Sequence, residues 1–423
     1  MDLPDRDPLV QDLIYTSSIG RTSGRKILKF EDLSEKDGIT RPTGSKADKE
    51  MRDYVVKLMK ELDLEVNVDK VGNIFGLWKG QSKETIMVGS HIDSVINGGH
   101  FDGALGVLSA IDVIRKLKNE KFKNKKSIEV VAFTGEEGSS FPVVCLGSKV
   151  LTGELSLEEA YNLKNKEGKT LIEILEDIEY KGTYIKNLQN VIYFIELHIE
   201  QGPVLYDKKF DIGVVDRISG VAWIQTKLYG KQAHAGTFPM NKRIDPTIAA
   251  ADIISYVNRN VNELIVVENR DSIKGTVGKI SSYPGLPNVI PAYIELGIDI
   301  RDTRKETFEN LINTIHRYIL DTEKRYKIKS EVLISKFNDP IELSSDIRSI
   351  IEEESQKMGY KTMHIDSGAT HDAAVMASKV KTGMIFVPSK DGISHSPLEW
   401  TDFENCKKGA YILKKVVEKL GGM

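Results

Sequence analysis

Apolar and polar positions along the chain form blocks that predict strands, loops and helices in a regular order. Short apolar runs at residues 86–88, 127–133 and 191–197 end in glycine-containing loops and are typical of buried strands. From Ala104 to Leu117 the apolar residues instead recur at helical spacing. This order of strand, loop and helix, which extends to about residue 213, predicts an α/β domain with a largely parallel sheet.

The same alternation resumes after about residue 330, so we expect one catalytic domain in two parts, residues 1–214 and 333–423. Residues 215–332 have a different rhythm and form a predicted inserted domain. We expect two helices packed on one four-stranded antiparallel sheet, of which the pattern marks three strands. The expected elements are strand 222–229, helix 246–261, strands 275–281 and 292–300 and helix 305–326 in the insertion, then helix 346–359, strand 384–387 and helix 401–420.

Polar residues that can bind metal follow several predicted strands of the catalytic domain. Because the carboxyl ends of parallel strands meet at one edge of a sheet, these loops are expected to line one crevice. On the first loop alone, a histidine near an acid is equally typical of a surface hydrogen-bonded pair. The candidate ligands, one or two to each loop, are His91, Asp102, Glu137, His198 and His395.

Five ligands exceed the three that a catalytic tetrahedral zinc takes, so the count predicts two divalent cations that share Asp102. Imidazole and carboxylate donors without a thiolate suit zinc, manganese or cobalt. Asp93 lies two residues after His91 on an extended segment, where its carboxylate could accept the hydrogen of the far imidazole nitrogen. Glu136, next to Glu137, is the candidate general base for a water that the metals hold.

Seven motifs in fixed order carry a resemblance to a known family: GSHIDSVINGGHFDGALGVLSA, TGEEGSSF, ELHIEQGP, HAGTFPM, PNVIPAYIELGIDIRD, SGATHDAAVMA and GISHSPLEWT. They resemble the amidohydrolase branch of the dinuclear aminoacylase/carboxypeptidase G metallohydrolases, from about Arg41 to the C-terminus. That branch contains N-carbamoyl-L-amino-acid hydrolases, allantoate and ureidoglycolate amidohydrolases and bacterial-type β-ureidopropionases. His198, where the peptidase branch usually has an acid, points to the amidohydrolases.

The resemblance implies metal ligation at the five positions and a base role for Glu136. It also implies a zinc-exopeptidase-like catalytic domain, and an insertion that serves as a lid and pairs with its copy in a homodimer. His234 would hydrogen-bond the developing oxyanion, from its own or the partner subunit, and Arg301 would bind the substrate carboxylate. Read alone, His234 is a surface or capping histidine and Arg301 a surface ion pair. Further implied substrate contacts are Gln201, Asn288, Gly368, Ala369 and Thr370.

Two positions depart from the family pattern. Thr370 replaces a glycine common in GAGHDA, and Phe238 replaces a threonine common in HAGTTPM. Both changes are expected to reshape the pocket around the substrate side chain.

The composition is that of an ordinary globular enzyme, with 40% hydrophobic and 29% charged residues among 423. A net charge of −3 gives no basic surface for nucleic acid or an anionic membrane. Cys145 and Cys406 are too few for a disulfide framework, and the N-terminal MDLPDRDPLV does not resemble a signal peptide. We therefore expect a cytoplasmic protein with a small-molecule substrate.

The expected reaction is metal-dependent cleavage of the ureido C–N bond of an N-carbamoyl-L-amino acid, giving the amino acid, carbon dioxide and ammonia. Allantoate, ureidoglycolate or β-ureidopropionate are alternative substrates. A dipeptidase or aminoacylase is a further alternative, and a metal-free binding protein that kept the fold is an alternative from outside the enzymes.

Overall fold

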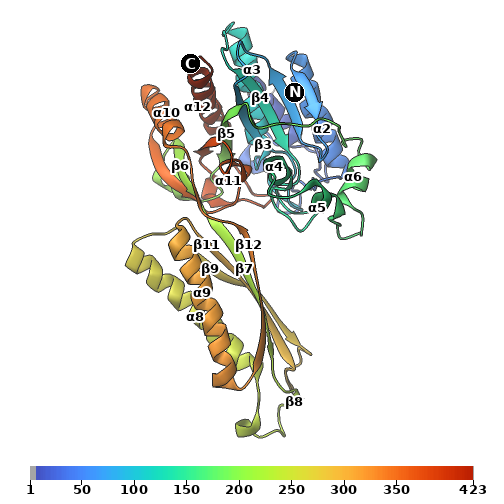
Figure 1. Cartoon of the computed structure of the whole chain (residues 1–423), viewed down its shortest axis with the longest axis vertical. Helices are drawn as coiled ribbons and strands as arrows, with labels where there is room; N and C mark the ends of the chain where they lie inside the picture. Colours follow the sequence, from blue (N-terminus) through green and yellow to red (C-terminus); the bar gives the residue numbers. More distant parts are fainter. Residues whose placement is uncertain (1–5, 423) are drawn as a thin grey trace. The chain divides into compact units, whose positions relative to one another are not determined.

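A computed structural model describes residues 6–422 of the chain, which divides into two compact units (Figure 1). The first unit contains the described residues up to Asp216, Glu342–Ile365 and the segment from His371 onward. The second unit contains Arg217–Ile341 and Asp366–Thr370. Residues 1–5, part of the stretch read for a signal peptide, lie outside the described residues. None of the helices within residues 6–422 combines the length and apolarity that a membrane crossing requires.

The first unit is built on a nine-stranded sheet in the order β1-β2-β4-β3-β5-β15-β6-β13, with β14 paired to β6. Its central strands β4, β3, β5 and β15 run parallel to one another. Every residue of β3 and β4 is buried, as expected for parallel strands covered on both faces. The strands are β1 (Glu65–Val68), β2 (Ile74–Trp78), β3 (Thr85–His91), β4 (Ser127–Phe133), β5 (Val191–Ile199), β6 (Ile212–Ile218), β13 (Ile341–Glu342), β14 (Thr362–Ser367) and β15 (Lys381–Val387).

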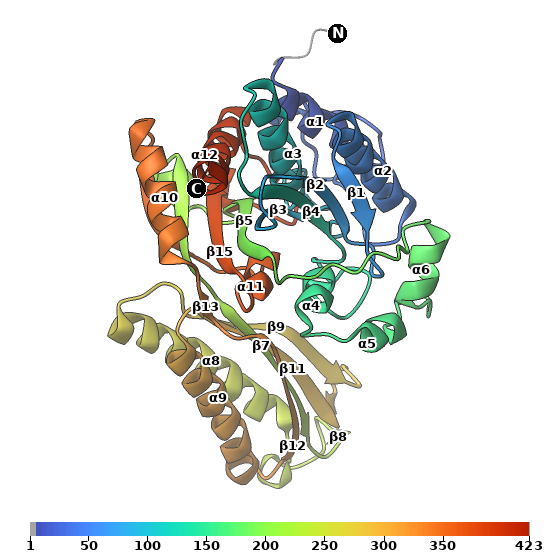
Figure 2. The same cartoon turned by 45° about the horizontal axis from the view of Figure 1, so that its top comes forward.

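Helices cover this sheet, and two of the longest, α3 and α12, pack side by side (Figure 2). The apolar residues of α3 and α12 belong to the main hydrophobic core together with those of β3 and β4. The helices are α1 (Pro8–Thr16), α2 (Lys46–Glu61), α3 (Ala104–Asn119), α4 (Leu146–Thr152), α5 (Leu157–Asn162), α6 (Leu171–Asp177), α7 (Val204–Lys208), α10 (Ser345–Lys357), α11 (Asp372–Met376) and α12 (Phe403–Gly422), with short 3-10 turns at Phe30–Asp32 and Lys390–Gly392.

The second unit has its own core between a four-stranded antiparallel sheet, in the order β12-β7-β11-β9, and two helices on one face (Figure 1). Buried and half-buried residues alternate along β11, because only one face of the sheet is covered. Its elements are β7 (Gly220–Tyr229), β8 (Ala233–His234), a 3-10 turn (Met240–Lys242), α8 (Pro246–Glu268), β9 (Lys274–Tyr283), β10 (Val289–Ile290), β11 (Tyr293–Asp302), α9 (Lys305–Tyr326) and β12 (Lys329–Asn338). The α/β fold with an inserted α+β domain is thus confirmed.

Three details differ from the sequence expectations. Helix α8 continues to Glu268, well past residue 261, and stops where Asn269 adopts a left-handed conformation with φ 49°. The expected end of the insertion, residue 332, falls inside β12, whose ladder with β7 continues to Asn338. The segment Asp366–Thr370, which we expect in the catalytic domain, groups with the second unit. Contacts between segments distant in sequence decide the last two boundaries, and residue type carries little information about such contacts.

Candidate metal centre and active site

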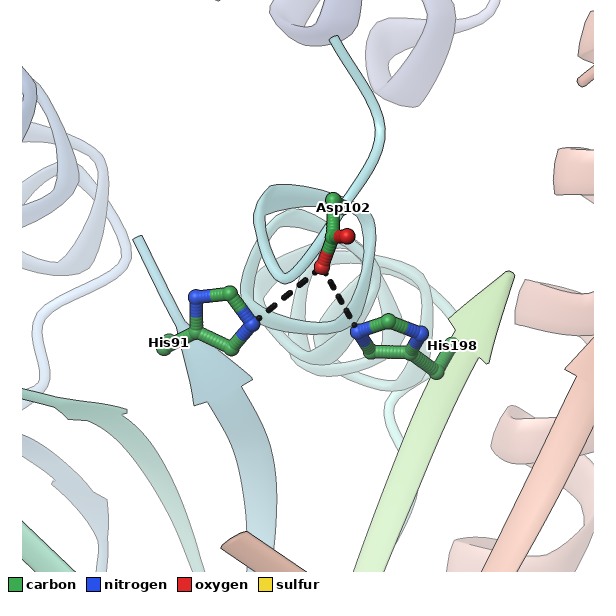
Figure 3. A group of neighbouring side chains, drawn as sticks. All are labelled: His91, Asp102 and His198. Carbon is green, nitrogen blue, oxygen red and sulfur yellow. Dashed lines mark ion pairs between the residues drawn. The ribbon is translucent and has the colours of Figure 1, made fainter. Parts of the chain in front are cut away.

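Neighbouring strand ends bring His91, Asp102 and His198 together (Figure 3). His91 is the last residue of β3, His198 lies near the end of the adjacent parallel strand β5, and Asp102 precedes α3. Asp102 Oδ1 lies 3.4 Å from His91 Nε2 and 3.1 Å from His198 Nε2. Gly103, with φ 65°, permits this approach, because a Cβ there would lie 2.3 Å from the His91 ring.

A second group of candidate ligands includes Oδ2, the other carboxylate oxygen of Asp102. His395 Nε2 lies 3.3 Å from Asp102 Oδ2 and 3.2 Å from Glu137 Oε2. The His395 backbone is left-handed with φ 53°, and its side chain is 50% exposed, whereas His91, His198 and Glu137 have buried side chains. Asp102 therefore faces both groups of ligands, one oxygen to each.

These residues fit two divalent cations. Ligand atoms about 2.0–2.1 Å from a tetrahedral ion lie roughly 3.3 Å from one another, close to the 3.1–3.4 Å between the histidine nitrogens and the carboxylate oxygens of both groups. Glu137 Oε1 is buried without a hydrogen-bond partner among the described residues, as a ligand awaiting an ion would be. Each group combines imidazole with carboxylate, a donor set suited to zinc, manganese or cobalt.

The cluster concentrates titratable groups in a dry environment. Burial, followed by the nearby Asp102 carboxylate, raises the pKa of Glu137 to about 8. Burial also raises the pKa of Glu136 well above its usual range. The hydrogen bond to Asp102 is the main cause that raises the pKa of His395 to about 9. A divalent cation would stabilise the ionised carboxylates and bind the histidines in their neutral form.

Asp93 does not make the contact that the sequence predicts. His91 Nδ1 is 3.1 Å from the backbone carbonyl of Asp93, while the nearest carboxylate oxygen of Asp93 is 3.7 Å away. The carboxylate instead accepts the backbone N–H groups of Glu136 at 3.2 Å and Glu137 at 3.3 Å. The carbonyl thus orients the histidine ring, and the carboxylate holds the loop that carries both acids.

Glu136 lies beside the first ligand group with its carboxylate oxygens in different surroundings. Its Oε2 is 3.7 Å from His91 Nε2, and its Oε1 accepts the Cys145 thiol at 3.4 Å. The backbone N–H of Cys145 also donates to the Glu136 carbonyl at 2.9 Å. The acid is therefore fixed on one side and faces the candidate metal ligands on the other.

Gln201 contacts a candidate ligand, although the family resemblance implies a substrate contact. Its Nε2 donates to Asp102 Oδ2 at 2.7 Å, and Ser394 Oγ lies 3.1 Å from the same oxygen. The Gln201 amide and the Ser394 hydroxyl therefore contact Oδ2 of Asp102, the oxygen that faces His395. The other oxygen, Oδ1, faces His91 and His198.

The other implied substrate residues lie in the second unit, in two separate places. Val289 pairs with His234 in the short ladder of β8 and β10, which puts Asn288 beside the histidine. His234 Nδ1 accepts the backbone N–H groups of Gly236 at 3.0 Å and Thr237 at 3.3 Å. Because Nδ1 is the acceptor, the neutral ring carries its hydrogen on Nε2.

Arg301 lies near the opposite end of β11 and contacts the Gly368–Thr370 segment. Its Nη1 donates to the Gly368 carbonyl at 2.9 Å, and Thr370 Oγ1 is bound to Asn338 Oδ1 at 3.2 Å. Asp299 accepts from Arg301 Nε at 2.9 Å and Nη2 at 3.2 Å. The structure therefore brings Arg301, Gly368, Ala369 and Thr370 together but separates them from His234 and Asn288.

Glu399 is a site residue that the sequence reasoning does not single out. It is fully buried, and its carboxylate accepts the backbone N–H groups of Phe101 and Asp102 and the hydroxyl of Ser394, the neighbour of His395. Burial and the nearby Asp102 raise its pKa to about 7. The acid in the motif GISHSPLEWT is visible in the sequence, but two of its partners are backbone N–H groups that no side-chain pattern marks.

Comparisons with known proteins identify relatives along most of the chain. The model of peptidase family M20/M25/M40 matches residues 87–419. An N-carbamoyl-L-amino-acid amidohydrolase of Pseudomonas sp. (strain NS671) is 33% identical over 390 residues, 90% of this chain and 93% of that protein. A ureidoglycolate hydrolase of Arabidopsis thaliana is 36% identical and aligns over 90% of this chain and 82% of its own length.

Among solved structures, a hydantoinase/carbamoylase family amidase from Burkholderia multivorans superposes with a TM-score of 0.88 at 30% identity, covering 99% of this chain and 98% of that one. The family match and the similarity over nearly the whole length confirm the predicted resemblance to amidohydrolases. The chain belongs to peptidase family M20/M25/M40, and it is a hydrolase of amide C–N bonds.

Proposed function

We propose that the chain hydrolyses the ureido C–N bond of an N-carbamoyl-L-amino acid and releases the amino acid, carbon dioxide and ammonia. The observation that carries the proposal is the pair of ligand groups sharing Asp102, with Glu136 3.7 Å from one of them. The similarity to the Pseudomonas amidohydrolase supports the substrate class. Two free, buried cysteines fit the reducing cytosol that we propose as the compartment.

In the proposed site, His91, Asp102 and His198 hold one divalent cation, and Asp102, Glu137 and His395 hold the other. When bound, such a pair of zinc, manganese or cobalt ions acidifies water and polarises the carbonyl oxygen of the substrate. Removal of divalent cations by a chelator should abolish turnover, and added manganese, zinc or cobalt should restore it. Full activity in a demonstrably metal-free sample would contradict the proposal.

Glu136 moves the proton in this mechanism. The Cys145 thiol engages Oε1, so Oε2, on the His91 side, is the atom we assign to accept a proton from the attacking water. As the C–N bond breaks, the same carboxyl group returns that proton to the leaving nitrogen. Burial raises the pKa of Glu136, whereas bound cations would favour the ionised form, which is the form that accepts the proton.

His234 is the proposed hydrogen-bond donor to the oxyanion, since its Nδ1 already accepts two backbone N–H groups and leaves Nε2–H free to donate. Arg301 is the proposed anchor for the substrate carboxylate. Asp299 and the Gly368 carbonyl engage three of its five N–H donors, which leaves two for a substrate oxygen pair.

Within the second unit, His234 and Arg301 lie too far apart to bind one substrate molecule. We therefore infer that they come from different subunits. Tyr293, at the His234 end of β11, and Arg301 are eight residues apart, which corresponds to about 27 Å of strand. No small ureido acid spans that distance. Gly368, which contacts Arg301, is only three residues before His371, a buried ring packed 4.6 Å from that of His198. We therefore assign Arg301 to the subunit that holds the metals, and His234 and Asn288 to the partner of a homodimer.

The proposed dimer pairs the inserted units along β9, an edge strand. Ile280 and Tyr283 on this strand are 61% and 54% exposed, an unusual exposure of large apolar side chains on an unpaired edge. A second copy paired along β9 would cover them.

One assay separates the candidate substrates. The manganese-loaded enzyme is offered N-carbamoyl-L-amino acids, ureidoglycolate, allantoate, β-ureidopropionate and dipeptides, and the release of ammonia or amine is followed. The proposal expects N-carbamoyl-L-amino acids to have the highest kcat/KM. Ureidoglycolate is the second candidate, favoured by the similarity to the Arabidopsis hydrolase. A preference for dipeptides would overturn the ureido assignment.

A further inference from the structure

Glu399 joins two loops that are almost three hundred residues apart in the sequence. Its Oε1 accepts the backbone N–H of Phe101 at 2.8 Å and of Asp102 at 3.1 Å. Its Oε2 accepts the hydroxyl of Ser394 at 2.8 Å. One buried carboxylate therefore contacts the backbone of the shared ligand and the residue directly before His395.

The surroundings of Glu399 provide both space for its side chain and donors for its carboxylate. Gly99 leaves the necessary space, since a Cβ at that position would lie 2.0 Å from the Glu399 carboxyl carbon. The side chain is fully buried, so its three donors have no solvent to replace it. Loss of the carboxylate would leave the backbone N–H groups of Phe101 and Asp102 without this acceptor.

The two candidate ligand groups depend on this contact to different degrees. Asp102 is also fixed by the start of α3, where its carbonyl accepts the N–H of Ala104 at 2.6 Å. His395 has a left-handed backbone and a half-exposed side chain, and it lies in a loop outside regular helices and strands. The link from Ser394 to Glu399 is therefore more important for placing His395 than for placing His91 and His198.

We propose that Glu399 is a positioning residue that, through Ser394, holds His395 at the distance from Asp102 that the second cation requires. This inference rests on the two-cation site of the proposed function. Residues that orient metal ligands typically contribute about 10- to 100-fold to metal affinity. We expect that contribution to fall on the cation held by Asp102, Glu137 and His395.

The test measures metal binding in the full-length protein. Manganese is titrated into the metal-free parent and into the variants Glu399→Ala, Glu399→Gln and Ser394→Ala by calorimetry. Electron paramagnetic resonance then reports whether two bound manganese ions are close enough to couple. His395→Ala, which lacks a ligand, marks complete loss of the second ion. Ser355→Ala removes a fully buried serine of α10 and serves as the control for loss of a buried hydroxyl.

We expect Ser394→Ala and Glu399→Ala to bind the manganese ion that His395→Ala loses about 10- to 100-fold less tightly, with the other ion nearly unchanged. The coupled signal should fall at manganese concentrations that saturate the parent. Glu399→Gln keeps an oxygen for the two N–H groups and a partner for Ser394, so it should restore most of the affinity. If Glu399→Ala does not fold, Ser394→Ala carries the test alone.

The inference is overturned if Ser394→Ala binds both ions with the parent's affinities, or if it weakens both ions equally. A parent protein that binds fewer than two ions and gives no coupled signal contradicts the proposed two-cation site itself. The two failures are therefore distinguishable.

Discussion

Glu136 and Glu137 are neighbours in sequence with different surroundings. Glu137 Oε2 lies 3.2 Å from His395, within a ligand group, whereas Glu136 contacts the Cys145 thiol and faces His91. The backbone N–H groups of both residues bind the Asp93 carboxylate, which fixes the peptide between them. Two adjacent acids thus serve as a proposed ligand and a proposed base because the backbone directs their side chains to different partners.

Replacement of Glu136 by glutamine should lower kcat by roughly 10²- to 10⁴-fold, because the amide keeps the shape but cannot accept the proton. KM should change little. The measurement is steady-state kinetics together with the metal content of the variant, which must equal that of the parent for the comparison to hold. A variant with nearly normal kcat would place the base elsewhere.

Replacement of Arg301 by lysine should chiefly raise KM, by about 1.5–3 kcal/mol or roughly 10- to 150-fold, since lysine keeps the charge but loses the planar fork. Asp299 holds Nε and Nη2 of this guanidinium. The loss should disappear for a carbamoylated amine without a carboxylate, which serves as the matched substrate. An equal loss with both substrates would show that Arg301 does not bind the carboxylate.

A cluster of charged side chains joins strand β14 and helix α10 to strand β6. His364 Nδ1 in β14 lies 2.8 Å from Asp216 Oδ1 in β6, and its Nε2 lies 3.5 Å from Glu352 in α10. Arg348 Nη1 binds the same Asp216 oxygen at 2.7 Å. The hydrogen bond to Asp216 is the main cause that raises the pKa of His364.

This raised pKa predicts the pH dependence of one substitution. Because the folded-state pKa is above the unfolded value of about 6.5, His364 stabilises the fold fully below that pH. The contribution is lost as pH rises through the folded-state pKa. The Tm difference between the parent and His364→Gln should therefore be larger at pH 6 than at pH 9. The half-buried His316→Gln is the control, and an equal difference at both values would contradict the prediction.

For the whole molecule, the important question is which subunit supplies His234. If His234 acts across a dimer, subunits carrying His234→Ala and subunits carrying Glu136→Gln should complement each other. A mixed dimer has one site with both native residues and one with neither, so statistical mixing should restore about a quarter of the parental activity. Mixed dimers that form, as shown by two affinity tags, and remain inactive would exclude action across the dimer.

The sequence by itself determines several of the long elements and the candidate ligands. Helix α9 matches the expected residues 305–326 because its apolar residues follow the helical period along its whole length. The residues His91, Asp102, Glu137, His198 and His395 are predicted to converge because each follows or ends a strand of a parallel sheet, and parallel strands present their carboxyl ends together. Periodicity and residue type are local properties, so they can be read from one chain.

Only the tertiary structure decides the distances between these parts. The distance between Arg301, near one end of β11, and His234, beyond the other end, depends on strand register. The extension of the inserted unit through β12 depends on pairing between strands that are distant in sequence. The roles of Asp93 and Glu399 depend on backbone N–H groups, which every residue except proline possesses and which no sequence pattern marks. Such contacts become specific only when the packed core holds distant backbones at hydrogen-bond distance.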